Sequence, residues 1–210
     1  MQLERRVIHK HVNSLKYGIM IPFLLLIAIH AVGQQLKDKN MKGIVPQGYV
    51  ITEVKALPQK HFLLITEQKQ KLTDDFHFQV PIILIKDSAG IVLNKGQYVT
   101  STLAPCGNEG FREVHVKGNA FTIEDNLCGD GLHIFSYVTF RYNSHLKSYM
   151  LSEYRKTLTT GGEEDNNSSI DIQYAIKKRL KFGEVTADTL LSFQLSPQSE
   201  RLYKRFVKKR

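Results

Sequence analysis

Two cysteines and two histidines in the middle of the chain are the residues best suited to nucleophilic chemistry. Cys106 and Cys128 are the only cysteines, and His115 and His133 lie near them in sequence. A cysteine nucleophile needs a histidine within hydrogen-bond reach and donors for the oxyanion. The surroundings, Ala-Pro-Cys-Gly-Asn and Leu-Cys-Gly-Asp-Gly, match no local motif of a thiol enzyme. The sequence therefore does not favour thiol catalysis.

The same residues are poor candidates for a metal site. Zinc ligands usually come as close pairs on a turn or helix, and Cys128-x-Asp130-x-x-His133 does not have that spacing. The acidic loop 163–167 offers oxygen atoms to calcium but lacks the alternating ligand order of a calcium-binding loop. We predict no metal and no other cofactor.

Four carboxylic acids in this region could supply the pair that glycoside hydrolysis needs: Glu113, Glu124, Asp125 and Asp130. The distance between two carboxyl groups decides that chemistry, and a sequence does not give the distance. The chain has no Gly-x-Ser-x-Gly elbow and no phosphate-cradling glycine-rich loop. A hydrolase of envelope polymers stays open as an alternative function.

The elements that position these residues are β-strands. Residues 111–154 alternate as four strands, with turn signals at 118–119, 128–131 and 143–145. In the first strand Glu113 and His115 fall on one side, and Arg112 falls on the other with Val114. Apolar residues on both faces of 132–142 predict a central strand that is covered on each side. Most of the aromatic residues of this stretch are expected to form core, and a binding platform is the alternative.

The rest of the chain from Gly43 predicts more strands and two short helices. Strands are expected at 48–54, 61–66, 78–86, 91–93 and 170–176, and Pro81 predicts a sheet edge or a bulge. One helix is expected near Thr186, and Ser196-Pro197 is typical of the start of another. The fold class is therefore mainly β: a single antiparallel β-sandwich or roll-like domain over 34–195, followed by a basic tail over 196–210.

The N-terminus follows the three-part plan of a secretory signal peptide. Basic residues between Arg5 and Lys16 precede an apolar run over 17–32, which is short for a membrane-spanning helix. Ala31 and Gly33 occupy the −3 and −1 positions for cleavage before Gln34. We expect residues 1–33 to be removed and the mature chain to be periplasmic or secreted. Retention of the segment as an uncleaved anchor is the alternative.

Three segments resemble a family of small, mostly uncharacterised secreted proteins of Gram-negative bacteria that carry the pattern FTIE…C…SYxTFKYD. They are Phe121-Thr-Ile-Glu124, Cys128, and Ser136-Tyr-Val-Thr-Phe-Arg-Tyr142. The similarity covers roughly residues 43–192 and is specific between about 106 and 154. Many members also carry an acidic VCBS or FG-GAP-like segment upstream, and here residues 55–65 have no Asp-rich loop. The resemblance implies export and a β fold, but no activity and no calcium site.

Two cysteines in an exported chain point to one disulfide bond, because disulfides form and persist in oxidising compartments. Cys106 and Cys128 both stand in turn-like settings beside strands, and members of the resembled family tend to have cysteines at both places. A bridge would close a loop of about 20 residues and stabilise the fold by roughly 3 kcal/mol. We predict a Cys106–Cys128 disulfide.

The net charge of +9 is concentrated at the two ends of the chain. Residues 34–200 carry equal numbers of basic and acidic residues, so nothing indicates the basic face of a nucleic-acid-binding protein. The tail is expected either to contact an anionic partner, a lipid headgroup or an acidic protein, or to keep the chain end solvated. Its basic residues are Arg201, Lys204, Arg205, Lys208, Lys209 and Arg210.

These patterns favour a non-enzymatic binding or interaction module of the cell envelope. The expected partner is an envelope protein or ligand of unknown identity, with no nucleic acid and with membrane contact only through the tail. An immunity or inhibitor protein that caps a secreted effector is an alternative from another class.

Overall fold

The computed structural model describes residues 44–68, 81–89, 91–96, 110–129, 131–160 and 168–208. The chain divides into two compact units, Met1–Lys42 and Gly43–Arg210, and all of the described residues belong to the second. The predicted signal peptide and its cleavage site lie outside the described residues.

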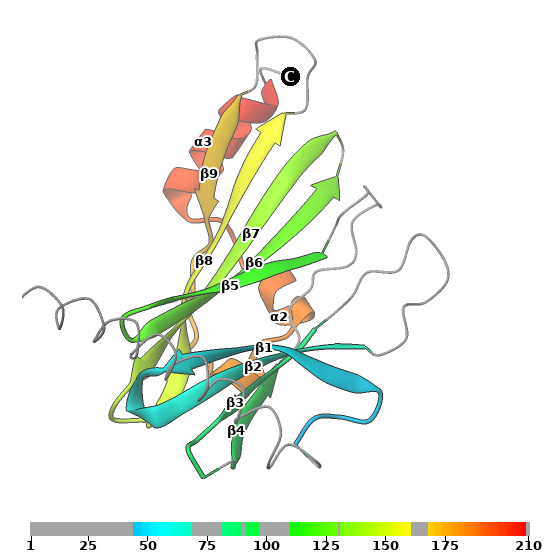
Figure 1. Ribbon diagram of the computed structural model, residues 1–210. Helices are drawn as coiled ribbons and strands as arrows, with labels where there is room; N and C mark the ends of the chain where they lie inside the picture. The colour runs from blue at the N-terminus through cyan, green and yellow to red at the C-terminus, as the bar shows by residue number, and fades with distance from the viewer. Residues whose placement is uncertain are drawn as a thin grey trace, which may run out of the picture. The chain divides into compact units, whose positions relative to one another are not determined.

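The first half of this unit forms an antiparallel sheet in the order β1-β2-β3-β4 (Figure 1). Its strands are β1 (Tyr49–Leu57), β2 (His61–Gln68), β3 (Ile82–Lys86) and β4 (Val92–Gly96), with the short 3₁₀ helix η1 (Pro58–Lys60) between β1 and β2. β3 pairs with both β2 and β4, so the expectation that Pro81 marks a sheet edge is wrong. Pro81 precedes the strand by one residue, where its missing N–H costs no ladder hydrogen bond.

The second half forms a five-stranded antiparallel sheet in the order β5-β6-β7-β8-β9. Its strands are β5 (Gly110–Lys117), β6 (Ala120–Gly129), β7 (Leu132–Asn143), β8 (Ser148–Thr160) and β9 (Ser169–Gln173). The predicted meander is confirmed, although β6 continues through Cys128 and Gly129, which the sequence placed in a turn. Gly118 and Gly131 have φ values of 59° and 71°, a left-handed backbone that favours glycine.

The strand β7 is central, as predicted, but only one of its faces is fully covered. Val138 and Phe140 are completely buried on the core face. On the opposite face Phe135 and Tyr137 stay half-buried. There the guanidinium groups of Arg112 and Arg155 lie 5.6 and 3.9 Å from the centroids of those two rings. Arginine side chains, rather than a second layer of core, therefore cover the outer aromatic residues.

Two hydrophobic clusters hold the unit together, and both use the same face of the five-stranded sheet. The first joins this sheet to β2 and β3 and includes Leu63, Ile85 and Phe121. The second lies further along the sheet and includes Leu127, Ile134 and Phe206. Cross-strand pairing places the sheet residues of the two clusters on one face. The predicted mainly β, sandwich-like fold is confirmed.

Short helical elements close the chain: η2 (Phe182–Glu184), α2 (Ala187–Leu191) and α3 (Pro197–Lys208). Both predicted helix starts are confirmed. The Thr186 hydroxyl accepts a hydrogen bond from the Thr189 N–H at 3.2 Å, and the Ser196 hydroxyl accepts one from the Ser199 N–H at 3.3 Å.

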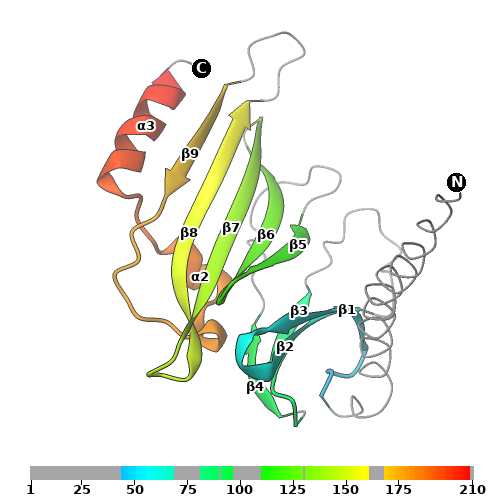
Figure 2. The same cartoon turned by 60° about the vertical axis from the view of Figure 1, so that its left-hand side comes forward.

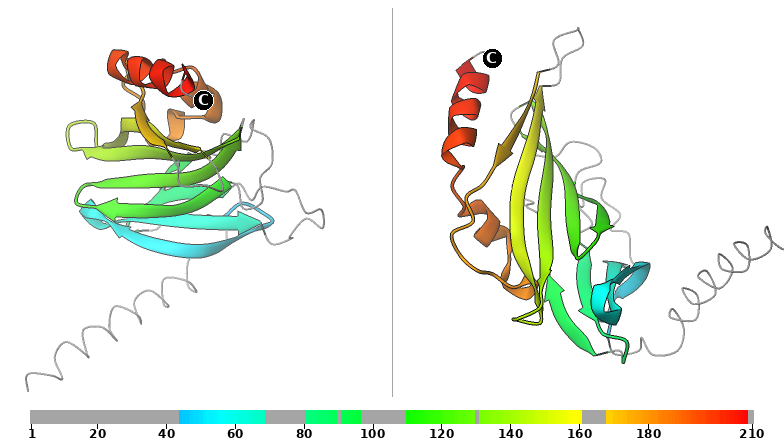
Figure 3. Two further views of the ribbon diagram at one scale, coloured as in Figure 1. Left: turned by 90° about the horizontal axis from the view of Figure 1, so that it is seen from above. Right: turned by 90° about the vertical axis from the view of Figure 1, so that its left-hand side faces the viewer.

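The helix α3 packs against the sheet (Figure 2). Phe206 is only 5% exposed, and the Ser199 hydroxyl accepts a hydrogen bond from the Gln173 N–H at 2.7 Å. The tail is thus an amphipathic helix that contributes to the core. α2 and α3 lie on the same side of the five-stranded sheet (Figure 3).

Candidate functional site

The C-terminal part of the chain is strongly basic. Residues Tyr174–Lys208, the basic segment, contain eight Lys/Arg residues and three Asp/Glu residues. Four of the eight precede η2 and are exposed: Lys177, Lys178, Arg179 and Lys181. The basic residues before η2 and those of α3 therefore belong to one run of chain. The first group lies beside β8, where Leu180 and Lys181 make backbone contacts with Leu151 and Met150. The concentration of positive charge extends well beyond the tail.

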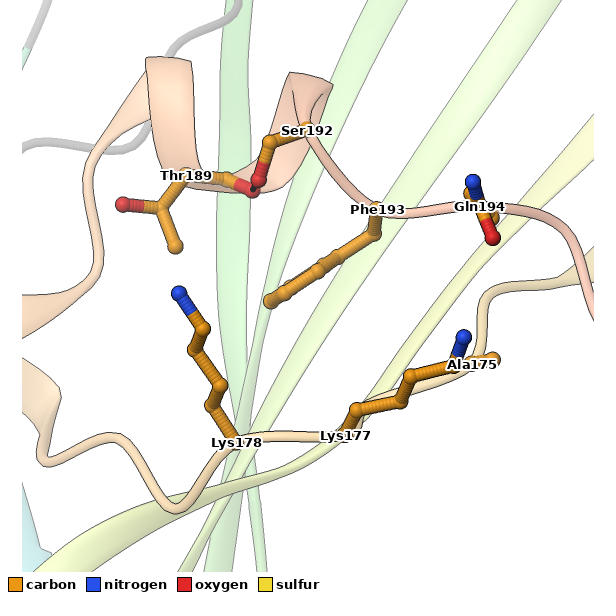
Figure 4. A pocket seen from close by; sticks show the side chains of 7 residues that line it. All are labelled: Ala175, Lys177, Lys178, Thr189, Ser192, Phe193 and Gln194. Carbon is orange, nitrogen blue, oxygen red and sulfur yellow. Dashed lines mark hydrogen bonds between the residues drawn. The ribbon is translucent and has the colours of Figure 1, made fainter.

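A pocket of about 380 Å³ lies within the basic segment, between the chain that leaves β9 and the end of α2 (Figure 4). The ammonium group of Lys178 points across the pocket toward Thr189 and Ser192, and the ring of Phe193 lies between the two walls. The lining residues are Ala175, Lys177, Lys178, Thr189, Ser192, Phe193 and Gln194.

Backbone contacts tie the two walls of the pocket together. The Ala175 N–H donates to the Gln194 carbonyl at 2.8 Å, and Tyr174 forms an antiparallel bridge with Leu195. Behind the pocket the ring centroid of Phe193 lies 6.3 Å from that of Tyr154. The Tyr154 ring in turn stacks on Tyr174 at 4.3 Å. The pocket is therefore pre-formed, as small-ligand sites usually are.

The chemistry of the lining suits an anionic oxygen ligand. Two ammonium groups stand among neutral hydroxyl and amide groups, and no carboxylate is among the seven lining residues. Lys donors bind carboxylate and phosphate oxygens through charge-assisted hydrogen bonds. The Ser192 hydroxyl donates to the Thr189 carbonyl at 2.7 Å, so it is engaged in the last turn of α2 rather than poised for attack. The geometry supports binding more than catalysis.

A row of polar residues, two of them ionisable, crosses the core face of the five-stranded sheet, between the two hydrophobic clusters. Asp125, Ser136 and Lys156 are successive cross-strand partners on β6, β7 and β8. Asp125 is completely buried, and neither of its carboxylate oxygens has a hydrogen-bond partner among the described residues. Burial, and secondly the charge of Glu124, raise the pKa of Asp125 to about 8, while Lys156 acts against the shift. Asp125 is therefore mostly protonated at neutral pH.

Lys156 completes this row without pairing directly with the carboxyl group. Its ammonium nitrogen lies 5.8 and 5.6 Å from the ring centroids of Tyr154 and Tyr174, within the range of a cation–π interaction. Burial lowers the pKa of Lys156, and the Asp125 charge opposes that shift. Because Asp125 and Ser136 are both 0% exposed, the row is part of the core and not a surface open to substrate.

The residues singled out from sequence are distributed over several places. Cys128 lies one residue before the end of β6, with its sulfur 3.7 Å from Nδ1 of His133. Cys106 and Asp130 lie outside the described residues, so the disulfide stays a prediction. Glu113 and Glu124 meet beside His115, whereas Asp125 is on the opposite face, so the four acids do not form one catalytic group.

The predicted basic tail residues share an exposed surface of α3 as far as the structure describes them. The exposed residues are Arg201, Lys204, Arg205 and Lys208. Lys204 donates to Glu200 at 2.7 Å across one helical turn. Lys209 and Arg210 lie outside the described residues.

Sequence reasoning missed the pocket and the buried row. The run Lys177-Lys178-Arg179 lies inside residues 34–200, whose charges sum to zero when they are counted together. Counting charges in short windows would have found it. Asp125 continues the alternation of Phe121 and Ile123, which already placed a carboxyl group on a core face.

Comparison of the chain with family models, with curated proteins and with solved structures finds no match. Among the described residues, no helix has the length and apolar character to cross a membrane.

Proposed function

We propose that the chain is an exported, non-enzymatic binding module whose pocket receives an anionic oxygen group of its partner. The observation that carries the proposal is the pair Lys177 and Lys178 in a pre-formed pocket that has no lining carboxylate. Phe193 supplies an apolar surface for the part of the ligand that bears the anionic group.

The helix α3 extends the surface offered to such a partner. At about 100° per residue, its four exposed basic side chains fall within an arc of about 100° on the side opposite Phe206. These side chains form a basic stripe that faces away from the sheet, where it can attract an anionic partner before contact. The residues of this stripe are Arg201, Lys204, Arg205 and Lys208.

Export and the disulfide bond belong to the same proposal. The signal-peptide pattern before Gln34 and the resemblance to secreted Gram-negative proteins support a periplasmic or secreted location. In that compartment Cys106 and Cys128 would be oxidised to a bridge.

The pocket can be tested with a fluorescein-labelled hexaglutamate peptide in a fluorescence anisotropy titration at low salt. The double variant Lys177→Gln/Lys178→Gln should bind about tenfold more weakly, because two charge-assisted contacts are lost. The matched control Lys60→Gln/Lys117→Gln removes the same charge from η1 and the end of β5, and it should bind like the unmodified protein. Arg201→Gln/Arg205→Gln should slow association more than it raises the dissociation rate.

Two results would overturn the proposal. One is equal binding by the pocket variant and its charge-matched control, which would show that binding depends on net charge and not on the pocket. The other is no measurable binding by the unmodified protein even at low salt, where surface electrostatic attraction is strongest. Competition by inorganic phosphate would show that phosphate groups share the site with carboxylates.

A further inference from the structure

A second site is formed on the opposite, partly exposed face of the five-stranded sheet by β5 and β6. Glu113 lies directly across from Glu124 in the β5–β6 pairing. His115 is two residues further along β5 and therefore on the same face as Glu113. A β-bulge between Phe111 and Glu113 changes the register of β5 at this point, a local change that re-aims side chains.

The three side chains bring one nitrogen and two oxygens together. Nε2 of His115 lies 3.4 Å from Oε1 of Glu113 and also 3.4 Å from Oε2 of Glu124. All three donor atoms lie within 4.8 Å of one another. Bonds of about 2.0–2.1 Å around a tetrahedral zinc ion place neighbouring donor atoms about 3.3 Å apart. Charge-assisted hydrogen bonds are shorter, at about 2.7–2.9 Å, so the spacing fits a shared ion better than direct hydrogen bonds.

Of the three residues, Glu124 has the carboxylate that a cation would stabilise most. Its side chain is only 9% exposed, and it stands opposite a second carboxylate, an arrangement that destabilises a strand pair. Arg112 donates to Oε1 of Glu124 at 2.9 Å and holds the carboxylate in place. The other oxygen, Oε2, accepts no hydrogen bond from the described residues and is directed at His115. Arg112 thus orients the carboxylate from outside, as residues behind a metal ligand do, and balances only one of the two negative charges.

We propose that Glu113, His115 and Glu124 bind a divalent transition-metal ion, with zinc as the best match to one imidazole and two carboxylates. A hard ion such as Mg²⁺ prefers a sphere of oxygen ligands and is excluded by the histidine. His115 and Glu113 are 54% and 43% exposed, so the ion reaches the site from solvent, and water completes its coordination. The site is independent of the pocket, because it uses the other face of the sheet.

The test is a calorimetric titration of the tag-free, chelator-treated protein with ZnCl₂. We expect one ion per chain with micromolar affinity, and at least about a tenfold loss of affinity in His115→Ala and in Glu113→Gln. His145→Ala, in the exposed β7–β8 turn, is the matched control and should leave affinity unchanged. His133→Ala removes the histidine beside Cys128, so it would weaken zinc binding at a competing site there but not at the site proposed here. Arg112→Gln should weaken zinc binding by a smaller factor than His115→Ala.

A second readout identifies the ligand directly. The imidazole nitrogen resonances of His115 should shift on zinc addition, and those of His145 should stay in place. The proposal is overturned if zinc binds no more tightly than about 0.1 mM, if His115→Ala binds as well as the unmodified protein, or if Mg²⁺ binds equally tightly. Circular dichroism of each variant shows that a loss of binding does not reflect a loss of fold.

Discussion

Replacing Asp125 by Asn should change how the stability of the protein depends on pH. Asp125 is completely buried, without a hydrogen-bond partner for either oxygen among the described residues. Burial raises its pKa from 3.8 to about 8. Between these two values the folded protein holds a proton that the unfolded chain has lost. Stability therefore falls as pH rises through this window, and the loss levels off above about pH 8.

The size of the effect follows from the two pKa values. Each pH unit inside the window costs about 1.4 kcal/mol of unfolding free energy. From pH 6 to pH 8 the unmodified protein should lose about 2 kcal/mol, since the slope flattens as pH approaches the folded-state pKa. Asp125→Asn has no proton to lose at this position, so this loss of stability should be absent from the variant. The free energy of unfolding of the variant, relative to that of the unmodified protein, should thus grow by about 2 kcal/mol between pH 6 and pH 8.

Urea denaturation at pH 6, 7 and 8, followed by tyrosine fluorescence, measures this difference. Lys156 contributes with the opposite sign, because its pKa is lowered by burial and stability from that group rises with pH. Comparing Asp125→Asn with the unmodified protein at the same pH separates the two contributions. Asp188→Asn, which changes an exposed carboxyl group on α2, is the control, and its free energy of unfolding should change with pH as that of the unmodified protein does. If the free energy of Asp125→Asn also changes in the same way, Asp125 is ionised in the folded protein and the reasoning fails.

Two further changes test the packing that positions the basic segment, and a third tests the predicted disulfide bond. Phe206→Ala should lower the free energy of unfolding by about 3 kcal/mol in urea denaturation, because it opens a cavity beneath α3, whereas the exposed Val207→Ala should cost well under 1 kcal/mol. Thr186→Ala removes the N-cap of α2 and should cost about 1 kcal/mol by the same measurement. Cys106→Ser should cost roughly 3 kcal/mol, and two titratable thiols in the unreduced, denatured protein would contradict the predicted bridge to Cys128.

The strands and helix starts were predictable because their signals are local. Alternation and turn residues define the meander from β5 to β8, and Ser196-Pro197 marks the start of α3. The assignment of strands to the two sheets was not predictable, since it depends on which strands fail to pair. The sequence predicts residues 196–210 as a tail outside the domain, but Phe206 is buried in the second core cluster.

The candidate metal site was hidden by a change of register. Simple alternation along β5 placed Arg112 on the side away from Glu113. The bulge between Phe111 and Glu113 brings Arg112 to Glu124 instead, on the face that carries His115. A bulge leaves no reliable mark in a single sequence, because it is defined by how the strand pairs with its partner strand. The meeting of Glu113 with Glu124 likewise depends on pairing, which residue types alone do not determine.

Both sheets are assembled solely from strands that are neighbours in sequence, as far as the described residues show. Each strand therefore pairs with a neighbour in the chain, and little loop-closure entropy is lost before most of these contacts form. Proteins dominated by such local contacts fold faster than β proteins with crossed connections. The step that joins distant parts of the chain is the closure of β2 and β3 onto the five-stranded sheet in the first core cluster. We expect this closure to set the folding rate, so that a chain starting from an unfolded state builds its two meanders first and docks them afterwards.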